Sequence, residues 1–171
     1  MLSTMFAGVF FLLCAFASMK DMESLTIPNW VNAGIALVFL PAALFVDISF
    51  ATFGWHLLTG LITFILCFIL FSVGAFGGGD AKMIPAVALW LGPLGIFPFL
   101  IGTTIAGGVL ALAVLVARKS IPQAFAPGFV RATMQEGNGV PYGVAISVGA
   151  IFGGFSSPFL TNFLSIFSSL N

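Results

Sequence analysis

Long apolar runs, separated by short stretches with charged, glycine or proline residues, fill most of this chain. A helix that crosses a bilayer needs about 20 predominantly apolar residues. The uncharged stretch 83–117 is too long for one such helix, and the turn residues Gly92-Pro93-Leu94-Gly95 divide it. The pattern therefore predicts about six helical spans. They cover residues 2–19, 30–46, 55–76, the two parts of 83–117, and 141–154.

The fourth of these spans is short. Residues 82–91 form only about 15 Å of helix at 1.5 Å per residue, roughly half of a hydrocarbon core about 30 Å thick. Either the turn at Gly92–Gly95 or the loop Gly77–Gly79 must then lie within the membrane. Because glycine permits tight, irregular backbone, we expect the glycine loop to fold inward. Such backbone is tolerated at that depth only where it is buried in protein or lines a wet cavity.

The composition supports a membrane protein. The chain has 171 residues, of which 60% are hydrophobic and 6% charged, whereas soluble domains carry about 25% charged residues. We therefore expect an all-α, polytopic integral membrane bundle, with residues 1–171 as a single domain in the lipid bilayer. No basic residue precedes Lys20, so the first run is interpreted as a retained span rather than a signal peptide. The net charge of zero argues against nucleic acid as a partner.

The basic residues predict an orientation, because Lys and Arg concentrate in cytoplasmic connections. All five lie in the connections after the first, third and fifth spans, and none lies after the second or fourth. This distribution places those three connections in the cytoplasm and both chain ends outside. The five residues are Lys20, Lys82, Arg118, Lys119 and Arg131.

Acidic residues gather on the same predicted side. Four of the five, Asp21, Glu23, Asp80 and Glu136, lie there, whereas Asp47 does not. Carboxylates at membrane depth are costly and usually functional. Two of them stand at span ends, since Asp21 follows the first span and Asp80 opens the fourth.

Asp80 has two interpretations. It follows Gly77, Gly78 and Gly79, and a carboxylate at a helix start can cap the free N–H groups there. A cap needs at most one glycine, however. Three glycines instead allow another backbone, such as an extended peptide, to approach closely.

The neighbouring polar residues receive simpler interpretations. Glu23 lies two positions after the first aspartate and would point elsewhere on a helix, so it is taken as a surface charge. Ile27-Pro28-Asn29 is a turn in which Asn29 is expected to cap the second span. Lys82 is taken as a marker of the cytoplasmic side rather than an ion-pair partner.

Three later stretches carry weaker expectations. Small residues in the fifth span are expected to permit close helix packing; they are Gly102, Ala106, Gly107 and Gly108. The connection 118–139 is either an amphipathic cover over the site or a loop, and we favour the loop. Residues 155–171 either continue the last span or form an interfacial helix.

Two carboxylates on one membrane face allow acid–base chemistry. When they approach closely they share one proton and titrate as a pair. One can activate a water, while the other polarises a carbonyl and protonates the leaving amine, without a metal or cofactor. The single histidine, His56, lies at the far end of the third span, and neither HExxH nor GxSxG occurs. Cys14 and Cys67 lie in apolar runs and are expected to be buried hydrophobic residues.

These motifs, taken in order, resemble those of the type IV prepilin peptidases, which are membrane aspartic proteases of the GxGD kind. The closest likeness is to the short tight-adherence branch, the TadV/CpaA-like enzymes, and it extends from Asp21 to about Ala150. The matching segments are Asp21-x5-Ile27-Pro28-Asn29, Gly77-x-Gly79-Asp80-x-Lys82, ALWLGP and VPYGVAI.

The resemblance implies that Asp21 and Asp80 are the catalytic pair, supported by the GxGD glycines Gly77 and Gly79. It also implies a bacterial inner-membrane enzyme, alone or as a homo-oligomer. The substrate would be a prepilin or pseudopilin with a short basic leader, cut at the cytoplasmic face. Longer relatives also N-methylate the new terminus and carry a cysteine-rich zinc loop. This chain has only two cysteines, so we expect a peptidase without methyltransferase activity.

An alternative from another class is a small transporter or proton-relay subunit that uses Asp80 in a broken helix. Transporters contain glycine-interrupted spans with intramembrane acids. That alternative favours acids near the membrane midplane and an inverted repeat, and the sequence contains no evident repeat. A purely structural membrane protein leaves the three glycines and Asp80 unexplained.

Overall fold

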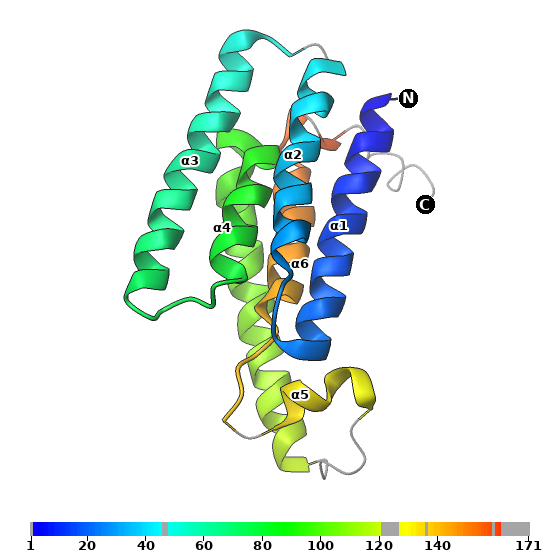
Figure 1. Cartoon of the computed structure of the whole chain (residues 1–171), viewed down its shortest axis with the longest axis vertical. Helices are drawn as coiled ribbons and strands as arrows, with labels where there is room; N and C mark the ends of the chain where they lie inside the picture. Colours follow the sequence, from blue (N-terminus) through cyan, green and yellow to red (C-terminus); the bar gives the residue numbers. More distant parts are fainter. Residues whose placement is uncertain (1, 46–47, 121–126, 136, 159, 162–171) are drawn as a thin grey trace.

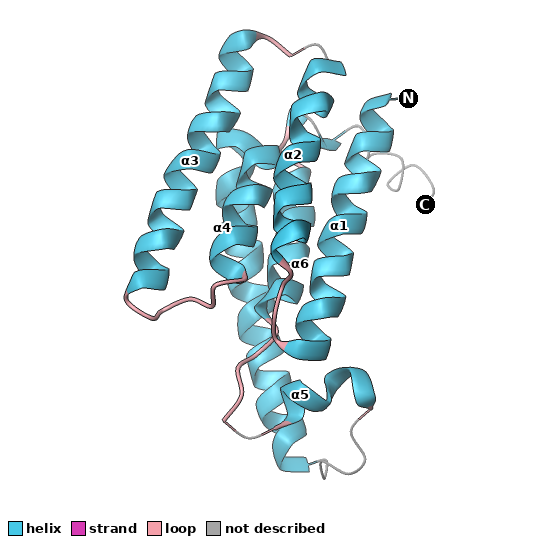
Figure 2. Cartoon of the chain, in the orientation of Figure 1, coloured by secondary structure: helices cyan, strands magenta, loops and turns pink. Residues whose placement is uncertain are grey.

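A computed structural model describes residues 2–45, 48–120, 127–135, 137–158 and 160–161. Every regular element of these residues is a helix, as the sequence predicts (Figure 2). Asp47, Glu136 and residues 162–171, on which three expectations fall, lie outside the described part. The elements in chain order are α1 (Leu2–Ser24), α2 (Asn29–Phe45), α3 (Phe50–Ser72), α4 (Asp80–Ser120), the 3₁₀ helix η2 (Gly128–Val130), α5 (Arg131–Met134) and α6 (Tyr142–Gly154).

Helix α4 reverses direction at Gly92. The backbone there has φ 62° and ψ −170°, which is not helical and which residues with a Cβ rarely adopt. Figure 1 shows the chain turning back at this point, so that α4 consists of a first arm (80–91) and a second arm (93–120). The predicted break at Gly92–Gly95 is confirmed.

The reversal at Gly92 lies against the middle part of α3, whereas the glycine loop lies at its end; the expectation that the glycine loop folds into the membrane stays a prediction. A methyl group on Gly92 would lie 2.6 Å from His56 Nε2, and His56 is about two turns inside α3. The Nδ1 of His56 donates a hydrogen bond to the carbonyl oxygen of Leu89 (2.8 Å). Gly78, by contrast, lies beside the ring of Phe71, at the last turn of α3. The loop therefore stays level with the end of α3, and the first arm is short because it turns back early.

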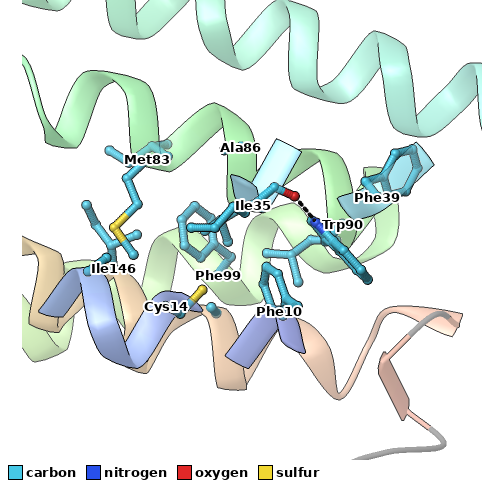
Figure 3. Close-up of a cluster of buried hydrophobic side chains, with 14 of the residues drawn as sticks. Phe10, Cys14, Ile35, Phe39, Met83, Ala86, Trp90, Phe99 and Ile146 are labelled. Atoms are coloured by element: carbon cyan, nitrogen blue, oxygen red, sulfur yellow. Dashed lines mark hydrogen bonds between the residues drawn. The ribbon is translucent and has the colours of Figure 1, made fainter. Parts of the chain in front are cut away.

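The first arm forms the centre of the bundle. Of residues 81–91, all except Lys82 and Leu89 are buried. Figure 3 shows Met83 and Trp90 of this arm packed among side chains of α1, α2 and α6. The Nε1 of Trp90 donates to the carbonyl oxygen of Ile35 in α2 (2.7 Å). The neighbouring helices enclose this arm, and this enclosure positions the start of the arm, where Asp80 lies.

The second arm packs against α6 through small residues. A methyl group on Gly102 would lie 3.0 Å from the side chain of Phe152, and one on Gly107 would lie 2.8 Å from that of Tyr142. The predicted packing role is therefore confirmed for these two glycines. Gly108 has no such neighbour within 4 Å, so the expectation for that residue is wrong. Small residues allow helices to approach closely where lipid provides no hydrophobic driving force.

Three helical segments are long and apolar enough to cross a membrane: Thr4–Ser24, Phe50–Ser72 and Asp80–Ser120. Two shorter helices, Asn29–Phe45 and Tyr142–Gly154, are also apolar. This composition is that of an integral membrane protein. The count of six membrane crossings stays a prediction.

The elements that carry the basic residues lie toward one end of the bundle. In Figure 1 the end of α1, the end of α4 and helix α5 lie toward the lower end, and the start of α4 lies above them, level with the lower end of α3. This arrangement agrees with the prediction from the basic residues that these connections share one side. Which side of a membrane they face stays a prediction.

Part of the connection expected to be a loop is folded against α1. It contains η2 and α5, and Arg118 of α4 donates to the carbonyl oxygen of Thr133 from both Nε (2.9 Å) and Nη2 (2.6 Å). Thr133 Oγ1 in turn donates to the carbonyl oxygen of Met22 (3.4 Å). The segment is thus attached to the last turn of α1, next to Asp21.

We predict that Gly92→Ala destabilises the protein by about 1–3 kcal/mol, because the new Cβ would have to adopt a glycine-type backbone conformation and would also contact the ring of His56. Gly108→Ala is the matched control and is expected to be neutral or slightly stabilising, since its Cβ meets open space in a helix. Thermal unfolding in detergent measures both variants. Equal melting temperatures for the two variants would contradict the role assigned to Gly92.

Candidate active site

Asp21 lies in the last turn of α1, which continues to Ser24, beyond the predicted end at Met19. Its side chain is only 5% exposed. Its Oδ2 accepts a hydrogen bond from the main-chain N–H of Gly143 (2.7 Å). Gly143 is the second residue of α6, where free N–H groups and the helix dipole favour a negative charge.

Gly143 allows this contact because it has no side chain. A methyl group there would lie 3.0 Å from Asp21 Oδ2 and 3.1 Å from Asp21 Cβ. Ser18 Oγ lies within hydrogen-bonding distance (3.1 Å) of the Gly143 carbonyl oxygen. The segment VPYGVAI is recognisable in the sequence, but the role of Gly143 is not, because the contact joins residues 122 positions apart.

Asp80 is the first residue of α4, and the glycine loop is folded closely around it. A methyl group on Gly77 would lie 3.1 Å from Asp80 Oδ2. The N–H of Ala81 donates to the carbonyl oxygen of Gly77 (3.0 Å), and the N–H of Met83 donates to that of Gly79 (3.0 Å). The loop glycines therefore permit close approach around the carboxylate and the first turn of the helix.

Ile27 connects the surroundings of the two aspartates. It is 5% exposed. A methyl group on Gly79 would lie 3.2 Å from both the Cβ and the main-chain nitrogen of Ile27, and one on Gly143 would lie 3.2 Å from its Cδ1. One side chain thus packs against the residue before Asp80 and against the residue that binds Asp21.

The two carboxylates border the same side chain, because Gly79, which precedes Asp80, and Gly143, whose N–H binds Asp21, both pack against Ile27. The structure therefore brings together the two acidic residues that the sequence singles out, from the end of α1 and the start of α4.

The other predicted residues surround this pair. Lys82 Nζ donates to Asn29 Oδ1 (2.8 Å), which links the first turns of α4 and α2. The carbonyl oxygen of Pro28 accepts from the N–H of Val31 (3.0 Å). Glu23 is exposed and forms an ion pair with Lys20 (2.8 Å), so its interpretation as a surface charge agrees with the structure.

Asn32 is a residue that the sequence analysis missed. It lies one turn after Asn29 in α2 and is 5% exposed. Its Nδ2 donates to the carbonyl oxygen of Gly79 (3.3 Å), so it holds the glycine loop beside Asp80. The available signal was a polar amide within an otherwise apolar helix. Among the described residues, no group of three or more His, Cys, Asp or Glu side chains is placed to bind a metal ion.

We predict that Ile27→Ala lowers the free energy of unfolding by about 2–5 kcal/mol, the usual cost of such a truncation in a core. The cavity would lie between Gly79 and Gly143, so both aspartates would lose part of their support. Ile101→Ala is the control, because Ile101 is 60% exposed on α4. Chemical unfolding in detergent compares the two variants. If they lose stability equally, Ile27 does not have the packing role assigned to it.

Comparison with known proteins identifies the chain's family. A family model described as the type IV leader peptidase family matches residues 8–112, which include Asp21, Ile27 and Asp80 but not Gly143. Neither the curated proteins nor the solved structures provide a match. The matched region is more than half of the chain, and the family is one of peptidases. This integral membrane protein therefore belongs to the type IV leader peptidase family.

Proposed function

We propose that the chain is an aspartic endopeptidase in which Asp21 and Asp80 act together. The observation that carries this proposal is that two acidic residues from separate helices lie around one buried side chain, Ile27, which packs against Gly79 next to Asp80 and against Gly143, the residue that binds Asp21. Membership of a leader peptidase family supports a peptide bond as the target. The substrate class is the prepilins and pseudopilins, whose basic leader would be removed ahead of the apolar segment.

The geometry supports a division of roles between the two acids. The N–H of Gly143 stabilises the ionised form of Asp21, so we assign Asp21 as the base and Asp80 as the acid. Asp21 takes a proton from water, and the water oxygen forms a bond to the scissile carbonyl carbon. Asp80, protonated, hydrogen-bonds to the carbonyl oxygen and later gives a proton to the nitrogen as the C–N bond breaks. The products are a carboxylic acid and an amine.

Three finer features belong to this proposal. The enzyme is of the short TadV/CpaA-like branch, works at the cytoplasmic face of a bacterial inner membrane, and does not N-methylate its product. The sequence motifs and the distribution of basic residues support the first two. Mass spectrometry of the product's new N-terminus, after incubation with a methyl donor, tests the third.

We predict that Asp21→Asn and Asp80→Asn each reduce cleavage of a co-expressed prepilin by about 100- to 10,000-fold, the usual contribution of an acid–base group. The double variant should be little worse than either single one, because the two groups act as a unit. Glu23→Gln is the matched control. It removes only an exposed ion pair, which contributes little to stability. Immunoblots of precursor and mature prepilin, with the enzyme level monitored, provide the measurement.

Normal cleavage by Asp80→Asn would rule out the acid–base pair. The proton-relay alternative makes a different prediction for the same variant, namely loss of a proton-dependent flux in vesicles without any effect on prepilin. One set of membranes can be used for both assays.

We also predict a bell-shaped dependence of kcat/KM on pH. The mechanism requires one proton on the pair. At low pH both carboxyl groups are protonated, so no base remains. At high pH both are ionised, so no acid remains. The measurement uses a synthetic leader peptide in detergent. If kcat/KM falls at only one end of the pH range, the pair does not share a proton.

A further inference from the structure

A pocket of about 520 Å³ lies between α2, α3 and the first arm of α4, and Lys82, two residues after Asp80, is among its lining residues. We call it the α2–α4 pocket. Its walls are mostly apolar, and its polar lining residues are Asn29, Asn32 and Lys82. The α2 wall is one helical face, because Asn29, Asn32, Ala33 and Ala36 follow the i, i+3, i+4, i+7 spacing. Its volume is within the range of small-ligand sites.

Asn32, which lines this pocket, has an unused hydrogen-bond acceptor. Its Nδ2 is bonded to Gly79 (3.3 Å), whereas its Oδ1 is buried and has no hydrogen-bond partner. Leaving a buried acceptor unpaired is energetically costly. A ligand that donates an N–H to this oxygen would recover that energy. Because the other half of the amide holds Gly79, the donor would lie next to the residue that precedes Asp80.

A second and larger groove lacks this property. It has a volume of about 1030 Å³ and lies between α1 and α6; we call it the α1–α6 groove. Its serine hydroxyls are satisfied within the protein. Ser18 Oγ donates to Ser147 Oγ (2.7 Å), and Ser147 Oγ donates to the carbonyl oxygen of Cys14 (2.9 Å). The α1–α6 groove is therefore the larger of the two. The α2–α4 pocket is the better site for a peptide main chain, because it contains a residue, Asn32, with an acceptor that has no partner.

The charge at the pocket mouth indicates which part of a substrate enters. Lys82 is exposed and lines the pocket, so its positive charge would repel a basic leader. The walls beyond it are apolar, with Leu57, Leu61 and Phe64 from α3 and Leu89 from α4. An apolar segment is therefore the part that fits.

We propose that the α2–α4 pocket binds the apolar segment that follows the scissile bond, in extended form, and that Asn32 Oδ1 accepts a main-chain N–H of that segment. Asn32 is thus a substrate-positioning residue: one end of its amide holds the loop at Gly79 and the other holds the substrate. This proposal rests on the proposed peptidase function. A lipid acyl chain would fill the same walls but has no N–H for Asn32.

An ester scan tests the hydrogen bond. In a synthetic prepilin-type peptide that the wild type cleaves, each main-chain amide after the scissile bond is replaced in turn by an ester, which removes one N–H. We expect one position at which the ester raises the KM of the wild type about 2- to 10-fold, as for loss of one hydrogen bond. In Asn32→Ala, the same ester should cause no further increase. Equal penalties in both enzymes at every position would overturn the proposal, as a lipid occupant would predict.

A pair of filling variants tests the location without altering Asn32. Ala33→Phe fills the α2–α4 pocket, and Ala15→Phe fills the α1–α6 groove; both alanines are exposed wall residues. We expect Ala33→Phe to raise KM at least about 5-fold with kcat little changed, and Ala15→Phe to leave both constants unaltered. The reverse result would overturn the proposal and assign the substrate to the other groove. This pair also decides the question if Asn32→Ala fails to fold.

The two proposals fail in different ways. If the wild type cleaves no prepilin-type peptide, the peptidase proposal fails and the pocket proposal fails with it. If the wild type cleaves the peptide but shows no coupling between Asn32 and any substrate N–H, only the pocket proposal is overturned.

Discussion

A single buried side chain, Ile27, separates the backbone that carries Asp80 from the backbone that binds Asp21. It packs against Gly79 on one side and against Gly143 on the other, and a side chain at either position would crowd it. The spacing of the two carboxylates therefore depends on one contact made by the turn between α1 and α2. Like charges held this close favour a shared proton, which is the state that acid–base hydrolysis requires.

The position of Asp80 depends on the reversal of α4. Because the chain turns back at Gly92, the first arm is short and is enclosed by its neighbours. This burial determines where its first residue, Asp80, lies along the axis of the bundle. His56 contributes to this arrangement by binding the carbonyl oxygen of Leu89 just before the turn (2.8 Å). His56 thus packs and hydrogen-bonds at one end of the first arm, and Asp80 lies at the other end.

The sequence predicted the parts of this arrangement that local patterns determine. The break at Gly92 follows from its turn residues, and the common side of Asp21 and Asp80 follows from the basic residues around them. It did not predict that α1 continues through Asp21 to Ser24, because apolar character ends at Met19 whereas helical hydrogen bonding continues. The roles of Gly143 and Asn32 could not be predicted, because each depends on a tertiary contact with a residue far along the chain.

The central claim is that the carboxyl groups of Asp21 and Asp80 meet, and cross-linking in native membranes measures this most directly. The chain would carry Asp21→Cys and Asp80→Cys, with Cys14→Ala and Cys67→Ala to remove the native thiols. A short bifunctional thiol reagent should join the two positions within one molecule, so that the halves stay linked after proteolysis between α2 and α3. Two thiols that each react with the reagent but never become linked would contradict the account.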